Sequence, residues 1–193
     1  QESLEASVGR RVCRNELWNV NQMGGWHLGY AQLAALQPVG SPELREQSLA
    51  RWARFPGFVD QEIENLRQGL KAGYSAPKTV VNRVIDQVNG LLALPVDQSP
   101  FFSPASRDDD ARFAEQTRSL VLDQINPAMQ RYRDYLENKY YPAAREELTV
   151  TANPNGRECY DASLRHYTTL SRSGEEVFRL GEQTVAANLA AVI

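Results

Sequence analysis

The stretch from Ser75 to Pro95, SAPKTVVNRVIDQVNGLLALP, decides the fold class of this chain. Its apolar side chains recur at i, i+1, i+4, i+5, i+8, i+11 and i+12, at Val80, Val81, Val84, Ile85, Val88, Leu91 and Leu92. This spacing forms one apolar stripe along an α-helix, despite the β-branched content of the stripe. Pro77 is tolerated in a first helical turn and Pro95 follows the last one, so the sequence predicts a long amphipathic helix here.

Two more helices are expected on the N-terminal side of this stretch. The segment 58–70 carries a second apolar stripe, formed by Phe58, Ile63, Leu66 and Leu70. Ahead of it, Ser41-Pro42 is typical of an N-cap followed by proline in the first helical turn. Pro56-Gly57 is expected to break the path between the two helices.

The ends of the chain and the region after Pro95 are also expected to be helical. A first helix is expected over about residues 4–36, with Gly24-Gly25 as a point of interruption. Another is expected over about 107–138, where Pro127 removes one amide donor and predicts a kink near Gln124. A last helix is expected to begin at a capping box, Ser173-x-x-Glu176, and to run to residue 193.

No alternating strand pattern is present beyond the short run at 148–151. The fold class is therefore expected to be all-α, with six or seven helices in an irregular array. At 193 residues and 21.7 kDa, with 42% apolar and 23% charged residues, the chain fits a single helical domain over 1–193.

The charge and the apolar runs exclude two classes of partner. The net charge of −3 is too small for a nucleic-acid footprint, and no apolar run approaches the length of a membrane span. The chain opens at Gln1, and its apolar end at 185–193 lacks a Gly, Lys or Arg that would close a helix. We expect a piece cut from a longer protein, with a docked terminal helix as the alternative.

The two cysteines, Cys13 and Cys159, lie near opposite ends of the chain. No C-x-x-C pattern is present, which excludes thioredoxin-like motifs and the common zinc ribbons. If the two pair, the bond closes a loop of nearly the whole chain, and chain entropy then contributes about 4–5 kcal/mol. The alternative is a pair of buried, reduced thiols that pack as small hydrophobic side chains.

The sequence carries no recognisable catalytic or metal-binding motif. His27 and His166 lack a His or Glu at the offsets of the metalloprotease motif H-E-x-x-H, and the phosphate- and dinucleotide-binding loops are absent. No metal or other cofactor is therefore expected in this chain. A polar cleft lined by His166, Tyr140 and Tyr141 is the candidate ligand site, against the alternative of structural packing.

An acidic run, Asp108-Asp109-Asp110, stands where the helix over 107–138 is expected to begin. Three carboxylates could bind a cation. Acidic residues are equally expected in a first helical turn, where the helix dipole favours negative charge. We prefer the second interpretation, which assigns the run to the start of the helix.

A series of short motifs follows in a fixed order along the chain. They are Cys13–Gln22 (CRNELWNVNQ), Gly25-Trp26, Asn65-Leu66-Arg67-x-Gly69, Gly73-Tyr74-x-Ala76-Pro77, Ser99-Pro100-Phe101-Phe102, Tyr141-Pro142-x-Ala144-Arg145, Pro154-x-Gly156-x-x-x-Tyr160, Thr168-Thr169, Glu175-Glu176-Val177 and Leu180-Gly181. In this order they resemble a bacterial family catalogued as domain of unknown function 885, over about residues 10–193.

The resemblance implies more than the residues themselves show. Members of the family are longer, mostly helical proteins described as secreted proteins or lipoproteins. Their fold is similar to the helical zinc peptidases, and a carboxypeptidase-like hydrolase role is inferred for them. The resemblance places the zinc helix in a later half of those proteins, so no zinc ligand or catalytic residue is carried over to this chain.

Two functional hypotheses follow. In the first, the chain is the non-catalytic helical part of a zincin-like peptidase, inactive alone, exported to the periplasm or beyond and lipid-anchored in its precursor. Export would favour pairing of Cys13 with Cys159. In the second, the chain is a self-sufficient helical binding or structural module that binds a peptide or an apolar ligand between its helices. The first hypothesis also expects association through an exposed apolar face.

Overall fold

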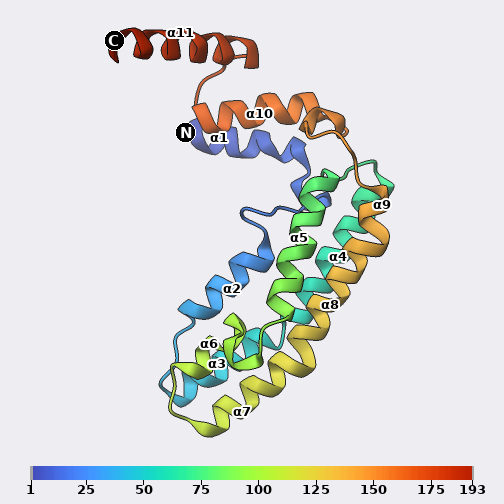
Figure 1. Cartoon of the computed structure of the whole chain (residues 1–193), viewed down its shortest axis with the longest axis vertical. Helices are drawn as coiled ribbons and strands as arrows, with labels where there is room; N and C mark the ends of the chain where they lie inside the picture. Colours follow the sequence, from blue (N-terminus) through green and yellow to red (C-terminus); the bar gives the residue numbers. More distant parts are fainter. Residues whose placement is uncertain (1, 193) are drawn as a thin grey trace. The chain divides into compact units, whose positions relative to one another are not determined.

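The computed structural model describes residues 2–192, and these residues form helices, turns and loops without a strand. The all-α prediction and the irregular array of helices are confirmed. Contacts within the chain define two compact units (Figure 1). We call Glu16–Glu147 the bundle, and the residues up to Asn15 together with those from Leu148 the terminal unit. The expectation of a single domain stays a prediction.

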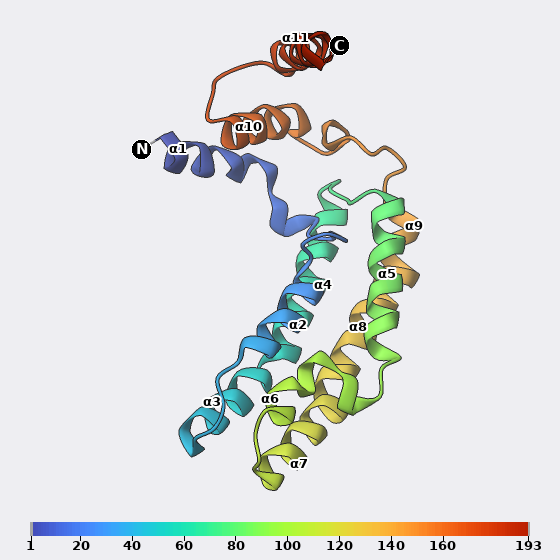
Figure 2. The same ribbon diagram turned by 60° about the vertical axis from the view of Figure 1, so that its left-hand side comes forward.

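The bundle contains four helices of more than ten residues, one short helix and a longer interrupted helix. The four are α2 (Trp26–Leu36), α3 (Pro42–Trp52), α4 (Phe55–Lys71) and α5 (Lys78–Leu92), and the short helix is α6 (Ser103–Ser106). The interrupted helix comprises α7 (Ala111–Leu120), α8 (Asn126–Tyr135) and α9 (Tyr141–Ala143). Short 3-10 turns lie at Asn15–Leu17, Val96–Gln98 and Pro100–Phe102. Helices α4 and α5 both pack along α8 (Figures 1 and 2).

The stripe predicted on α5 faces the core of the bundle. Val81, Val84 and Val88 are fully buried, and Ile85 is nearly so. Each such side chain contributes about 1.5–3 kcal/mol by leaving water, which outweighs the weak preference of β-branched residues for strands. Burial against α8 therefore makes this segment a helix.

The helix expected over 107–138 runs from Ala111 to Ala143 with two π-helical segments in it. These segments are Val121–Ile125 and Leu136–Tyr140. Each ends two residues before a proline, Pro127 and Pro142. A proline ring clashes with the carbonyl four residues earlier, and the wider π turn makes room for it without ending the helix. The effect expected of Pro127 thus takes the form of a π segment at Val121–Ile125.

The single helix expected over 4–36 is wrong, because residues 10–25 interrupt it with 3-10 turns and a loop. The side chain of Asn21 accepts hydrogen bonds from the amides of Met23 and Gly24, which forms a turn. A Cβ on Gly25 would lie 2.2 Å from the Asn21 carbonyl oxygen, so the close approach requires glycine. Helix α2 begins only after this turn.

A break between α3 and α4 is present as predicted, but it lies at residues 53–54, and Pro56-Gly57 belong to the first turn of α4. The Ser41 hydroxyl caps α3 by accepting from the Leu44 amide, as expected. Helix α3 ends at Trp52, and α4 begins at Phe55 with Pro56 in its first turn. This short connection places the nearly fully buried rings of Trp52 and Phe55 side by side in the core.

The terminal unit contains α1 (Glu2–Gly9), α10 (Gly156–Thr168) and α11 (Gly174–Val192), with 3-10 turns at Arg10–Cys13 and Val150–Ala152. Helix α1 packs on α10, and Arg165 forms a two-bonded ion pair with Glu2. The predicted capping box of α11 is confirmed, because Ser173 and Glu176 each accept from the other's amide. Gln1 lies outside the described residues, and so does Ile193, where the last helix is expected to end.

Candidate functional site

A pocket of about 470 Å³ opens where α2, α3 and the start of α4 meet in the bundle. We call it the aromatic pocket. It is lined by Tyr30, Gln47, Ala50, Arg51, Trp52, Arg54, Phe55 and Phe58. Its volume lies within the range of small-ligand sites in proteins. The break between α3 and α4 creates it, because seven of the eight lining residues lie within two helical turns of that break.

The inner wall of the aromatic pocket is fixed by packing. Trp52 and Phe55 are only 2% and 3% exposed, and their ring centroids are 6.2 Å apart. Tyr30 and Phe58 are partly buried, with ring centroids 4.8 Å apart and their planes inclined by 37°. Two buried rings therefore support two that remain accessible, a geometry suited to an apolar or aromatic group.

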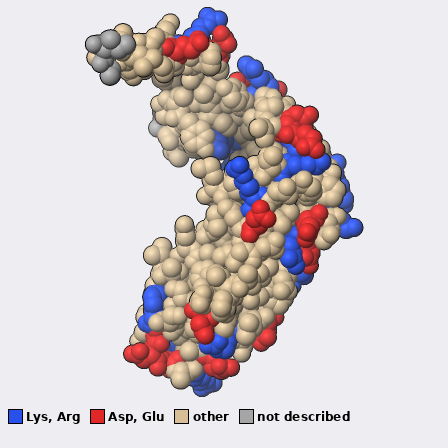
Figure 3. All heavy atoms as spheres, in the orientation of Figure 1, with Lys and Arg blue, Asp and Glu red and all other residues tan. Residues whose placement is uncertain are grey.

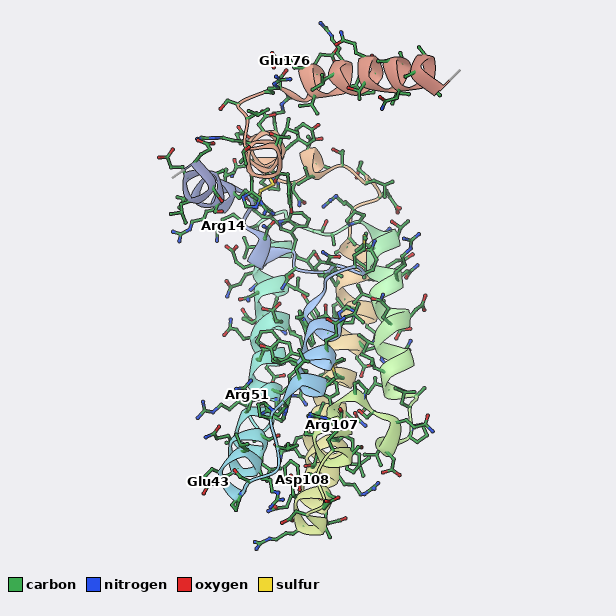
Figure 4. The ribbon with its side chains drawn as sticks, turned by 90° about the vertical axis from the view of Figure 1, so that its left-hand side faces the viewer. Arg14, Glu43, Arg51, Arg107, Asp108 and Glu176 are labelled. Atoms are coloured by element: carbon green, nitrogen blue, oxygen red, sulfur yellow. A yellow bond between two sulfur atoms is a disulfide. The ribbon has the colours of Figure 1, made fainter. Side chains whose placement is uncertain are left out.

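The rim of the aromatic pocket is basic. Arg51, labelled in Figure 4, comes from α3, and Arg54 lies in the turn before α4. Both side chains are exposed, and neither forms an ion pair or side-chain hydrogen bond within residues 2–192. The lining contains no carboxylate. Two positive charges therefore face this pocket without a partner.

Three other pockets of the described chain differ in this respect. Each includes at least one carboxylate among its lining residues: Glu115 and Asp123 in one, Asp60 and Glu64 in another, and Asp161 in a third. On the face shown in Figure 3, acidic and basic residues of the bundle also lie next to one another. Unbalanced positive charge beside aromatic rings thus distinguishes the aromatic pocket.

A buried carboxylate, Glu62, lies on α4 elsewhere in the bundle and is only 8% exposed. Its Oε2 accepts from Asn19 Nδ2 at 2.7 Å, and its Oε1 accepts from Asn65 Nδ2 at 3.3 Å. Burial, and then the charge of Glu62, raise the pKa of the Tyr132 hydroxyl. These contacts give the carboxylate the partners that a buried charge needs, and we assign it to the architecture of the bundle.

The three residues predicted to line a cleft lie in different surroundings. Tyr140 is fully buried in the bundle, and its hydroxyl accepts a 2.8 Å hydrogen bond from the Ala76 amide. Tyr141 is partly buried, with Lys78 Nζ 5.7 Å from its ring centre. His166 belongs to α10 of the terminal unit, where its Nδ1 lies 3.4 Å from the Ser7 hydroxyl. A common cleft of the three stays a prediction.

Cys13 and Cys159 lie together in the terminal unit, where the structure joins them as a disulfide with Cα atoms 4.6 Å apart. Both side chains are buried. The bond links the turn after α1 to α10. The oxidation state in solution stays a prediction, tested by a free-thiol count on unfolded, unreduced protein.

The described residues bring no three His, Cys, Asp or Glu side chains into a group that could hold a metal ion. In the same part of the chain, no helix combines the length and apolar character that crossing a bilayer requires.

The acidic run marks the start of a helix, as the preferred interpretation expects. The Asp110 side chain accepts a hydrogen bond from the Phe113 amide and caps α7.

Sequence reasoning missed the aromatic pocket. The available signal was the alternation of arginine and aromatic residues at the predicted helix break, in Arg51-Trp52-x-Arg54-Phe55-x-x-Phe58. Tyr30 belongs to a helix that is distant in the sequence, and no local pattern relates it to this segment.

The fold is shared with a solved structure, "The crystal structure of the putative lipoprotein from Colwellia psychrerythraea". The two superpose with a TM-score of 0.81 at 19% sequence identity. The match covers 88% of this chain and 31% of the other, so this chain spans about a third of that protein's length. No curated protein matches the chain. The model of the family described as "Bacterial protein of unknown function (DUF885)" matches residues 1–193, and the chain therefore belongs to this family.

Proposed function

We propose that this chain is the non-catalytic, peptide-binding helical part of a longer carboxypeptidase-like bacterial protein. The observation that carries the proposal is the aromatic pocket, which combines accessible rings with two unpaired arginines. Peptides offer both apolar side chains and carboxylates to such a site. The fold shared with a lipoprotein about three times as long supports a role within a larger chain.

The proposal assigns no zinc ligand to the described residues. Zinc needs three or four nitrogen, sulfur or carboxylate ligands in one place, and residues 2–192 do not bring three together. We therefore assign none of them to metal binding and derive no reaction step from them. Any hydrolysis belongs to residues of the longer protein. Export to the periplasm or the medium, with a lipid anchor in the precursor, is proposed by analogy with the lipoprotein.

The proposal is tested by peptide hydrolysis. Peptides with a free C-terminal phenylalanine are incubated with the 193-residue chain and, separately, with the longer protein in the presence of zinc. We expect cleavage by the longer protein, loss of that cleavage with a chelator, and intact peptide with the chain alone. Cleavage by the chain alone, or none by the longer protein, would contradict the proposal.

The core of the bundle supports a second candidate, a self-sufficient binding or structural module. Its main cluster of buried apolar residues is continuous from α2 to α9. A module of this kind would unfold in one cooperative transition and stay monomeric. The face of α11 distinguishes the candidates, because Phe178, Val185 and Leu189 are 63%, 59% and 62% exposed. A surface that the longer protein covers should associate when it is left open.

A further inference from the structure

We propose that the aromatic pocket binds the C-terminal residue of a peptide, with its apolar side chain among the rings and its carboxylate against Arg51 and Arg54. This inference rests on the proposed peptide-binding function and specifies which part of the peptide is recognised.

The apolar half of the site selects a side chain. The pocket volume of about 470 Å³ accommodates a large side chain together with part of the backbone. Tyr30 and Phe58 are the accessible rings. The nearly buried Trp52 and Phe55 both contact the Tyr30 ring, and Phe55 also contacts the Phe58 ring, which holds the two in place. Because rings pack favourably edge to face or offset against other rings, phenylalanine or tyrosine should be preferred at this position.

The basic half of the site selects the terminal carboxylate. Arg51 and Arg54 are separated by the break between α3 and α4, so both line the same pocket from its rim. Guanidinium groups bind carboxylates through paired, charge-assisted hydrogen bonds. Neither arginine has an ion-pair partner among the described residues. A ligand carboxylate can therefore bind them without displacing an Asp or Glu side chain of the protein.

The third polar side chain of the lining favours a peptide over a fatty acid. Gln47 offers both an amide donor and a carbonyl acceptor, which complement the two halves of a peptide bond. A fatty acid has a carboxylate and an apolar chain but no amide for Gln47 to bind. The same site could still accept it weakly, so the experiment includes this class of ligand.

The test is a calorimetric titration of the 193-residue chain with three probes. These are N-acetyl-phenylalanine, N-acetyl-phenylalanine amide and octanoate. We expect saturable 1:1 binding of the first probe, with the amide at least tenfold weaker because it lacks the carboxylate. Octanoate should also bind at least tenfold more weakly than the first probe.

Variants assign the binding to this pocket. Arg51→Gln with Arg54→Gln should weaken N-acetyl-phenylalanine at least tenfold and remove the preference for the free acid over the amide. Arg83→Gln is the matched control, because Arg83 is an exposed arginine of α5 without an ion pair in the described chain. It should bind like the parent. Circular dichroism checks that each variant is folded.

Three results would overturn the inference: no binding of any probe, equal binding of acid and amide, or octanoate binding as tightly as the amino-acid probe. A fourth is an equal loss of affinity in Arg83→Gln. These failures are distinguishable from failure of the proposed function. If the longer protein cleaves peptides and the pocket binds none of the probes, the assignment of this pocket to peptide binding is wrong, and the place of the chain in a carboxypeptidase-like protein stands.

Discussion

At the residue scale, two buried polar groups set the response of the bundle to pH. His27 is 1% exposed and the side chain of Asp108 is covered by Arg45. The two groups differ in the charge of their hydrogen-bond partners. The histidine has only a neutral partner, whereas the aspartate has a guanidinium and two backbone amides. The pKa of each group is lowered, by desolvation in the first and by hydrogen bonding to Arg45 in the second.

His27 should make the bundle less stable as the pH falls through the range where histidine titrates. Its Nε2 donates to Gln87 Oε1 at 2.9 Å, while the Gln87 amide nitrogen donates to the Gln22 carbonyl. Burial lowers the pKa of His27, so below about pH 6.5 the unfolded chain takes up a proton that the folded chain resists. The contribution of the neutral His27 to stability is therefore fully present above that pH and is lost as the pH falls through the lowered pKa of the folded chain.

Urea unfolding of the parent and of His27→Gln between pH 8 and pH 5 measures this effect. The variant should show a smaller loss of unfolding free energy over the range, although it is less stable at pH 8. Equal slopes in the parent and His27→Gln would refute the assignment.

Asp108 should contribute to stability in a lower pH range. Its carboxylate accepts from Arg45 Nε and from the amides of Gly40 and Asp110, which lowers its pKa to about 2. The folded pKa lies below the unfolded value of about 3.9, so the contribution is present above that value and is lost as the pH falls towards 2. Asp108→Asn should unfold at lower urea concentration at pH 6, with a difference from the parent that shrinks by pH 2. A difference that is constant with pH would contradict this.

At the element scale, the sequence predicted those helices whose own stripe or cap decides their formation. The α5 stripe, the Ser41 cap, the break just ahead of Pro56 and the Ser173 capping box all depend on neighbours in the sequence, and all are present. The helix expected over 4–36 failed because 3-10 turns and a loop interrupt it from residue 10, well before the interruption expected at Gly24-Gly25. The aromatic pocket was missed because it depends on tertiary contacts that join α2 to α3 and α4.

Gly69 on α4 and Gly90 on α5 differ in their surroundings, because only Gly69 lies against the backbone of another segment. A Cβ on Gly69 would lie 1.8 Å from the Leu17 carbonyl oxygen, whereas one on Gly90 would meet nothing within 4 Å. Gly69→Ala should therefore destabilise the bundle by about 1–3 kcal/mol through overpacking. Gly90→Ala should stabilise it by about 0.5–1 kcal/mol, because alanine is the better helix former. Chemical denaturation checks both, and a Gly69→Ala variant as stable as the parent would contradict the packing described.

At the scale of the whole molecule, exposed apolar residues are concentrated in the terminal unit. Among the described residues, ten of the fifteen large exposed apolar side chains belong to it, although it is the smaller unit. On α11, Phe178, Val185 and Leu189 recur at i, i+7 and i+11 and form one apolar side. A patch of this kind marks an interaction surface, which the proposal assigns to the longer protein.

Sedimentation velocity tests this surface. The 193-residue chain should self-associate as its concentration rises, and serine at Phe178, Val185 and Leu189 together should shift it towards monomer. Serine at Arg179 and Gln183, on the polar side of α11, is the matched control and should leave association unchanged. A parent chain that is monomeric at every concentration would favour the self-sufficient module instead.

The central claim, that these helices belong to a peptidase-like protein without carrying its catalytic metal, is tested most directly by the zinc content of the 193-residue chain. The chain is equilibrated with zinc, dialysed against metal-free buffer and analysed by elemental mass spectrometry. We predict that the zinc content returns to that of the buffer. One tightly held zinc ion per chain would contradict the claim and would place a metal site within this part of the protein.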